Sequence, residues 1–291
     1  MYLPEEILNA KVLISVKTYP IPSKKYEELV CNAGFLENGK WIRIYPIPFR
    51  SLPYEEQYRK YTWIELDLVR NHRDFRPESY RPKRGFEEPI KHISKVDTKD
   101  NWRERKKYAL KEVYHSMNEL ISHAKEKNRW KSLATLKPKE IVDFVIEDDD
   151  REWSSQKQQE LKQMSLFSMH KNKSSEFNIV RKIPYKFYYR FITEGDKKPR
   201  KLMIEDWEIG ALYWNCLRRA NGDEEIAKQQ VRKKYEQEFL SGNKDIHLFL
   251  GTTQAHHHRS KNPFVIIGVF YPPITRQRSL FDFKKNKFSI K

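Results

Sequence analysis

Cysteines and long apolar runs are scarce in this sequence, and each scarcity excludes a class of protein. Only two of the 291 residues are cysteine, Cys31 and Cys216, too few for a disulfide framework or a four-thiolate zinc site. Their apolar neighbours favour buried free thiols. Uninterrupted apolar runs are short, for example residues 265–267, whereas a membrane span needs roughly 20 apolar residues. Because the first residues also lack a secretory pattern, we expect a cytoplasmic protein without a membrane partner.

Common catalytic motifs are also missing. The sequence contains no GxxxxGK(S/T), GxGxxG, GxSxG or CxxC pattern, so nucleotide hydrolysis, dinucleotide use and serine or zinc chemistry have no support. The adjacent His256, His257 and His258 do not suit a metal site on a strand, where neighbouring side chains point to opposite faces. We expect no metal and no other cofactor, and we assign His257 and Arg259 to a phosphate-contacting loop.

Positive charge dominates the composition. Lysine and arginine outnumber aspartate and glutamate by 57 to 40, which gives a formal net charge of +17. Such an excess favours a polyanionic partner, and nucleic acid is the first candidate. Aromatic residues make up 13% of the chain, too many for a disordered protein. We therefore expect a folded protein that binds DNA, with single strands favoured, or RNA, which suits the same contacts.

Hydrophobic patterning predicts strands in the first third of the chain. In residues 1–97, β-branched and aromatic residues alternate with polar ones. The expected strands are 11–19, 28–35, 40–45, 62–70 and 90–96. Five short strands with long connections fit a small barrel of the OB type, and an SH3-like barrel fits nearly as well. Residues 98–137 then carry apolar residues at helical spacing and predict a helical connector.

Residues 138–291 predict a second β-rich domain with inserted helices. The expected strands are 139–147, 182–193, 201–204, 246–251 and 265–271, and the expected helices are 206–219 and 223–239. Asp206 and Asp223 are placed as N-caps of these helices. We interpret 148–178 as a mobile insertion and 274–291 as a C-terminal tail. The predicted fold class is α+β and β-rich, with two OB-like small barrels or half-barrels and inserted helices.

Basic and aromatic residues are interleaved in three N-terminal stretches, at 17–26, 40–50 and 75–86. In single-strand binding, cations follow the phosphates while aromatic rings stack on bases. The residues that we expect to contact nucleic acid are Lys17, Tyr19, Lys24, Lys25, Trp41, Arg43, Tyr45, Arg50, Arg76, Arg81, Lys83, Arg84, His257 and Arg259.

One of these stretches predicts a binding platform. On the strand 40–45, Trp41, Arg43 and Tyr45 share one face, and Ile42 and Ile44 share the other. This alternation predicts an exposed Trp-Arg-Tyr platform over an aliphatic core. The alternative is that the two aromatic rings cover the other side of a two-sided core, with Arg43 paired to an acid.

Two short motifs share the same residues at the same spacing, QMSLF at 163–167 and QRSLF at 277–281. Both resemble the pentapeptide of Q-L-(S/D)-L-F type with which bacterial polymerases, repair enzymes and clamp loaders bind the β sliding clamp. The second copy also partly resembles the QxxLxxFF box of archaeal and eukaryotic clamps. The resemblance implies clamp contacts by Gln163, Leu166, Phe167, Gln277, Leu280 and Phe281. The alternative is that the Leu-Phe pairs dock on the protein's own core.

A second resemblance covers much of the chain. The segments GKWIRIYPIPFR (39–50), KTYPxPSxKY (17–26) and NPFVIIGVFYPP (262–273) resemble prokaryotic proteins described as dual OB-containing. The resemblance implies two OB domains and brings no activity with it.

Together these patterns predict a DNA-associated, nucleoid-associated protein that binds nucleic acid through its basic aromatic N-terminal face. Two contacts with the sliding clamp would raise its local concentration at replicating or repaired DNA, or at phage DNA during defence.

The alternative is a metal-dependent nuclease or another nucleic-acid-modifying enzyme of a prokaryotic defence system, so the sequence leaves open whether the protein is an enzyme. A nuclease of this kind needs carboxylates that converge on a divalent metal. The candidate ligands are Glu65, Asp67, Glu205, Asp206 and Glu208.

Overall fold

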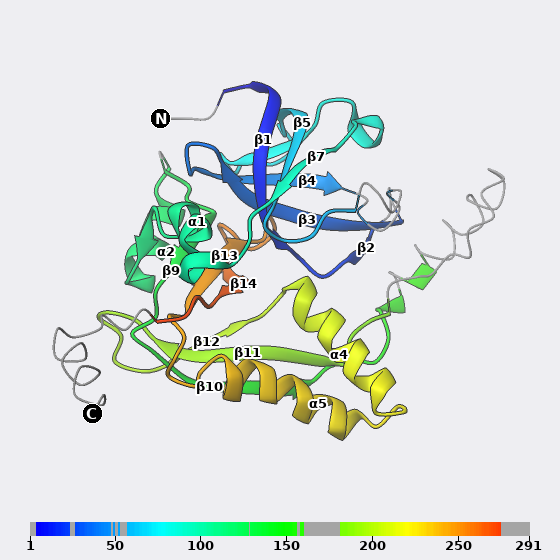
Figure 1. Cartoon of the computed structure of the whole chain (residues 1–291), viewed down its shortest axis with the longest axis vertical. Coiled ribbons are helices and arrows are strands. Elements are labelled where there is room, and N and C mark those ends of the chain that lie inside the picture. The colour runs from blue at the N-terminus through cyan, green and yellow to red at the C-terminus, as the bar shows by residue number, and fades with distance from the viewer. Residues whose placement is uncertain are drawn as a thin grey trace, which may run out of the picture.

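The protein consists of two β-rich halves that lie one above the other (Figure 1). The structure is a computed structural model that describes residues 4–23, 27–47, 49, 52, 57–127, 129–155, 158–159 and 181–274. These residues form three sheets and four α-helices. The prediction of a β-rich α+β fold is therefore confirmed.

The first half is a closed five-stranded barrel. Its strands are β1 (Glu6–Lys17), β3 (Glu27–Leu36), β4 (Trp41–Ile47), β5 (Thr62–Arg70) and β6 (Ser79–Pro82), and two further strands extend the sheet, β2 (Ile21–Ser23) and β7 (Lys91–Lys95). The barrel strands pair in the order β1-β3-β4-β6-β5, and β5 pairs again with β1. Strands β4 and β6 run parallel, and the other pairs are antiparallel.

The second half repeats this strand order. Its strands are β8 (Val113–Tyr114), β9 (Leu133–Leu136), β10 (Glu140–Asp148), β11 (Tyr185–Ile192), β12 (Arg200–Met203), β13 (His247–Thr252) and β14 (Phe264–Phe270). Strands β10, β11 and β12 pair in sequence. Directly after β12, Ile204 forms a parallel bridge with Ile266 of β14. Strand β14 pairs with β13, and β13 pairs with β9, which leads into β10.

The outer face of the first barrel is covered by the second half. The Trp41 ring lies 4.1 Å from Phe35 and 5.2 Å from Phe249 of β13, measured between ring centroids. Phe249 is in turn stacked on Phe270 of β14, and all four rings belong to one buried cluster. Because this joint removes apolar surface from water, it fixes the two halves relative to each other.

The helices cap and connect the strands. They are α1 (Lys99–Ala109), α2 (Met117–Lys125), α4 (Trp207–Arg219) and α5 (Glu224–Arg232), and α5 continues into a π-helical turn at Lys233–Glu238. Asp206 accepts a hydrogen bond from the Glu208 N–H at 3.1 Å, and Asp223 accepts one from the Ile226 N–H at 3.0 Å. Both predicted N-caps are thus confirmed. None of the described helices is long and apolar enough to cross a membrane.

Some sequence-based expectations differ from the structure. The segment 98–137 contains the two short strands β8 and β9 between and after its helices, and the short strand β6 was not expected. The expected insertion 148–178 and the tail 274–291 lie mostly outside the described residues. Cys216 is buried as expected, whereas Cys31 is partly exposed.

Candidate nucleic-acid interface

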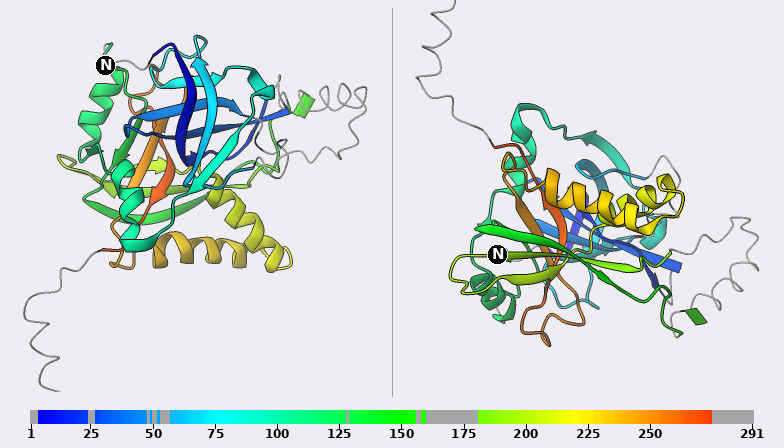
Figure 2. Two further views of the ribbon diagram at one scale, coloured as in Figure 1. Left: turned by 45° about the horizontal axis from the view of Figure 1, so that its top comes forward. Right: turned by 90° about the horizontal axis from the view of Figure 1, so that it is seen from below.

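Two loops that hold the same position in the two halves lie side by side. Residues 71–78 join β5 to β6, and residues 253–263 join β13 to β14, the pair of strands that holds the equivalent place in the strand order of the second half. The Gln254 side chain donates to the carbonyl of Arg73, and Arg76 donates to the carbonyl of Thr252. The β13–β14 loop projects from the side of the molecule opposite α4 and α5 (Figure 2, right).

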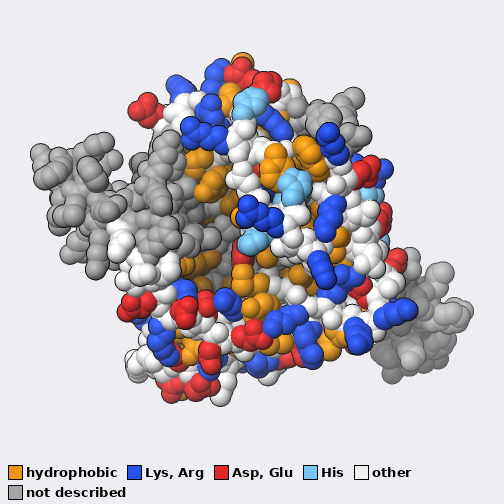
Figure 3. Space-filling view, turned by 180° about the vertical axis from the view of Figure 1, so that it is seen from behind, with side chains coloured by type: hydrophobic (Ala, Val, Ile, Leu, Met, Phe, Trp, Pro, Cys, Tyr) orange, Lys and Arg blue, Asp and Glu red, His pale blue; other side chains and the backbone are white. Residues whose placement is uncertain are grey.

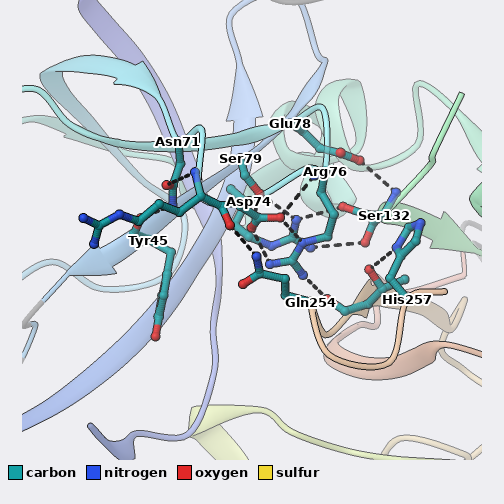
Figure 4. A network of polar contacts seen from close by, with 12 residues as sticks. Tyr45, Asn71, Asp74, Arg76, Glu78, Ser79, Ser132, Gln254 and His257 are labelled. Atoms are coloured by element: carbon teal, nitrogen blue, oxygen red, sulfur yellow. Dashed lines mark hydrogen bonds and ion pairs between the residues drawn. The ribbon is translucent and has the colours of Figure 1, made fainter. Parts of the chain in front are cut away.

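A buried ion pair holds the first loop in one conformation (Figure 4). Arg76 Nε and Nη2 donate to the Asp74 carboxylate at 2.8 and 2.5 Å, and the Ser79 hydroxyl donates to it at 2.7 Å. Burial alone would raise the pKa of Asp74, but the hydrogen bonds from Arg76 lower it below its usual value. The carboxylate therefore stays ionised and keeps its partners.

Glu78 and Arg43 connect the same loop to the start of strand β9, and Figure 4 shows Glu78 beside Ser132. Glu78 Oε1 accepts hydrogen bonds from the N–H groups of Ser132 and Leu133 at 2.9 and 3.1 Å. The Arg43 guanidinium donates to the hydroxyls of Ser132 and Ser79 at 2.8 and 3.2 Å. These side chains are buried in the joint, where Glu78 Oε1 and the Arg43 guanidinium have hydrogen-bond partners and Glu78 Oε2 has none. They therefore position the loop and leave ligand contacts to its outer side.

A buried histidine anchors the second loop. His257 Nε2 lies 2.7 Å from the carbonyl oxygen of Ala124, and Nδ1 lies 2.8 Å from the Thr252 hydroxyl. A carbonyl oxygen only accepts, so Nε2 carries the proton and Nδ1 accepts from the hydroxyl. Burial lowers the pKa of His257, which favours this neutral form. The prediction of a phosphate contact by His257 is therefore wrong, because the side chain is fully buried.

Three rings from three segments meet on the outer side of these loops, and we call them the ring cluster: Phe75, Trp130 and His258. The Phe75 and His258 rings are stacked, with centroids 4.4 Å apart and planes at 28°. Trp130 lies 5.9 Å from each of them, with its plane at 81° to Phe75 and 72° to His258. The φ angle of Trp130 is +36°, a left-handed conformation that non-glycine residues seldom adopt and that tends to occur at ligand sites.

Cations without a described acidic partner lie in the same segments as the ring cluster. They are Arg73, Lys125, Lys127, Arg259 and Lys261, all exposed, and none forms an ion pair with another described residue. On the rear face of the molecule, histidine side chains lie among hydrophobic side chains, with Lys and Arg side chains around them (Figure 3). Rings beside unpaired positive charge are the combination that binds bases and phosphates.

The predicted Trp-Arg-Tyr platform is not exposed. Trp41 and Arg43 are 7% and 2% exposed, because β13 and β9 cover this face of the barrel. Tyr45 is partly buried. Ile42 and Ile44 fill the barrel core as expected. The alternative of a two-sided core is therefore correct for Trp41, while Arg43 has hydroxyl partners instead of an acid.

Other expected nucleic-acid contacts are scattered. Arg76 is buried in the loop, and Lys17 is buried beneath Phe49, with its Nζ 4.0 Å from the ring centroid. The hydroxyl of Tyr19 accepts from Trp214 Nε1 at 2.8 Å and donates to a backbone carbonyl. The remaining residues of this set are Arg81, Lys83, Arg84 and Arg259, which are exposed, and Lys24, Lys25 and Arg50, which lie outside the described residues. Lys83 is paired with Glu6 and Arg84 with Glu88.

The acidic candidates do not converge. Asp206 is buried and accepts from Lys60 Nζ at 2.7 and 2.8 Å, and Glu208 is exposed beside the same lysine. Burial raises the pKa of Asp206 to about 6. Glu65 and Asp67 lie on β5, where Glu65 pairs with Lys91 and Asp67 accepts from a backbone N–H. The parts of the chain that the structure describes contain no group of three or more metal-ligating side chains.

The clamp motifs fall outside the described residues, so the structure says nothing of Gln163, Leu166, Phe167, Gln277, Leu280 or Phe281. Conversely, the ring cluster was not found from the sequence. Phe75 lies in a basic aromatic stretch and the histidines form a motif of their own, but Trp130 belongs to neither, and no local pattern brings residues 75, 130 and 258 together. Their only shared signal is an aromatic or imidazole ring beside arginine in a loop.

Comparisons with known proteins give families without an assigned activity. The model described as Domain of unknown function (DUF8758) matches residues 8–111, and that described as Domain of unknown function (DUF8757) matches residues 113–285. The curated proteins yield no match. A solved structure described as "Structure of murine DNA binding protein bound with ds DNA" aligns over 94% of this chain and 97% of that chain, with a TM-score of 0.30 and 8% identity. Since the DUF8757 model matches more than half of the chain, this protein belongs to the DUF8757 family of domains of unknown function.

Proposed function

We propose that the protein binds nucleic acid with the ring cluster and the exposed cations around it. The observation that carries the proposal is the convergence of three rings, from distant segments, within 6 Å of one another at a surface. Rings of this kind stack on bases, and neighbouring arginines and lysines contact phosphates. DNA is the expected ligand, and RNA offers the same two contacts.

We also propose that both halves are OB-type barrels. OB barrels close in the strand order 1-2-3-5-4, with strands 3 and 5 parallel. The order β1-β3-β4-β6-β5 and its repeat in the second half support this assignment, with β4 parallel to β6 in the first half and a parallel bridge from Ile204 to β14 in the second. OB proteins commonly contact oligonucleotides with the loop between strands 4 and 5. Residues 71–78 and 253–263 hold that position, so the ring cluster lies where two such loops meet.

A salt titration of DNA binding tests the proposal. The affinity of the wild type for a labelled single strand should fall as salt rises, because binding releases counterions. The double variant Arg73→Ala/Arg259→Ala should bind more weakly. The plot of log affinity against log salt concentration should be less steep than that of the wild type, by about 1 to 2. The matched control Arg218→Ala/Lys233→Ala removes two exposed charges near α4 and α5, on the other side of the molecule, and should retain the wild-type slope. Equal slopes in both double variants contradict the proposed site.

Recruitment to a sliding clamp is a further part of the proposed function, supported by the repeated QxSLF motif alone. Leucine and phenylalanine would fill an apolar pocket of the clamp, with glutamine at the rim. Two such contacts would deliver the protein to DNA under replication or repair, or to phage DNA during defence. A pull-down with the host clamp tests this, because Phe167→Ala/Phe281→Ala should abolish binding. Retention of the clamp by the double variant contradicts recruitment and leaves the nucleic-acid site unaffected.

A further inference from the structure

We infer that the ring cluster holds one unpaired base at a time, so that the preferred ligand is DNA with an isolated unpaired nucleotide, such as a bulge. A continuous single strand would gain no further stacking contact. This inference rests on the proposed function and specifies the ligand of the same site.

The three rings contact one another and do not line a track. Phe75 and His258 are stacked at 4.4 Å, so each ring already covers one face of the other. Trp130 stands at 81° and 72° to this stack and forms a wall beside it. Within the cluster, the exposed His258 ring is therefore the ring on which a base can stack. One base is enough to extend the stack of Phe75 and His258.

The face of the first barrel does not extend the site. In OB proteins, the face of strands 2 and 3 carries oligonucleotides, and the corresponding strands here are β3 and β4. The rings of Phe35 and Trp41 on this face are packed against Phe249 of β13, at 6.0 and 5.2 Å. The second half thus occupies the surface along which a strand would otherwise run.

The corresponding face of the second half, on β11 and β12, carries cations that are paired with acidic side chains. Lys186 pairs with Asp149 at 2.8 Å, and Arg190 pairs with Asp143 at 2.5 Å. A third cation, Lys201 of β12, is paired with a glutamate. Because each cation is already neutralised, this face offers phosphates little attraction. The segments of the ring cluster instead carry the five exposed cations without a described acidic partner that were named above, which favours a short ligand contact.

An unpaired base fits this geometry better than a base pair does. The faces of bases inside a duplex are already stacked, and extruding a paired base costs a few kcal/mol. For a bulged nucleotide most of this extrusion energy is not required, because the base is already unpaired. The flanking duplex still presents phosphates to the exposed cations.

Three DNA probes of equal length test the inference: a duplex with one bulged 2-aminopurine, the same duplex fully paired, and a single strand. The bulged duplex should bind about tenfold more tightly than the paired one and change its fluorescence, and the single strand should bind no more tightly than the bulged duplex. His258→Ala should remove the advantage of the bulge. The neighbouring exposed residue supplies the control, His256→Ala, which should retain it.

The outcomes separate the inference from the proposed function. Equal binding of bulged and paired duplexes, or affinity that grows steadily with the length of single strand, overturns the inference and leaves nucleic-acid binding standing. Failure of all three probes to bind overturns the proposed function as well. Thermal melting of His258→Ala verifies that the variant is folded, as expected for an exposed side chain.

Discussion

Replacing Arg76 should loosen the loop that presents Phe75 without removing any residue of the ring cluster. The guanidinium makes two hydrogen bonds to Asp74 and one to the carbonyl of Thr252, and both charged side chains are buried. In Arg76→Leu, the Asp74 carboxylate keeps the Ser79 hydroxyl and a backbone N–H as donors but loses the guanidinium that forms an ion pair with it.

The size of the effect follows from the buried charge that remains. Breaking a buried ion pair by removing one partner costs about 3 to 5 kcal/mol of unfolding free energy. Replacing both partners costs less, because no unpaired charge is left, so Asp74→Asn/Arg76→Leu should recover about 1 to 2 kcal/mol. The difference in unfolding free energy between Arg76→Leu and the wild type should also shrink as the pH falls into the range in which carboxyl groups become protonated, since protonation removes the unpaired charge of Asp74.

Urea unfolding at several pH values measures these differences, and DNA binding by the same variants shows whether the loop serves the site. We expect Arg76→Leu to weaken DNA binding as well, because Phe75 lies between Asp74 and Arg76 in sequence. The reasoning is refuted if the single variant loses less than about 1 kcal/mol, or if the double variant is less stable than the single one.

Two further changes test buried side chains of the first barrel. Trp41→Ala should lower the unfolding free energy by about 3 to 5 kcal/mol, because the ring is packed against Phe249; a loss below about 0.5 kcal/mol in thermal melting would indicate an exposed ring. Burial and the neighbouring charge of Lys60 lower the pKa of Lys17 to about 8 from 10.5. Since a lowered lysine pKa favours the neutral form in the fold, the unfolding free energy should rise as the pH increases above about 8, by up to roughly 3 kcal/mol. In urea unfolding, Lys17→Met should lack this rise. A pH profile identical to that of the wild type would contradict the prediction.

The sequence predicts the strands of the first barrel well, because one face of each strand lies in a core. The expected strand 62–70 coincides with β5, and Ile42 and Ile44 are buried as the alternation requires. The caps Asp206 and Asp223 were also identified, since capping depends on residues within one helical turn. Strands of four residues, such as β6 and β9, carry too short a pattern to be recognised.

Alternation shows which residues share a face but not what covers that face. Trp41 and Arg43 do share one, yet the cover comes from β9 and β13, which are distant in sequence. The site depends on the same kind of information. Phe75, Trp130 and His258 come together only through tertiary packing, so no periodicity or motif marks them as neighbours.

The most direct test of the central claim is the equilibrium affinity for DNA with an unpaired nucleotide, measured by fluorescence anisotropy for the wild type and Phe75→Ala/His258→Ala. Stacking on aromatic rings is worth about 1 to 3 kcal/mol per base, so we predict a loss of affinity of roughly 5- to 150-fold, with little change in the salt slope because no lysine or arginine is removed. Wild-type affinity in this double variant would contradict the account and place the nucleic-acid contact elsewhere on the protein.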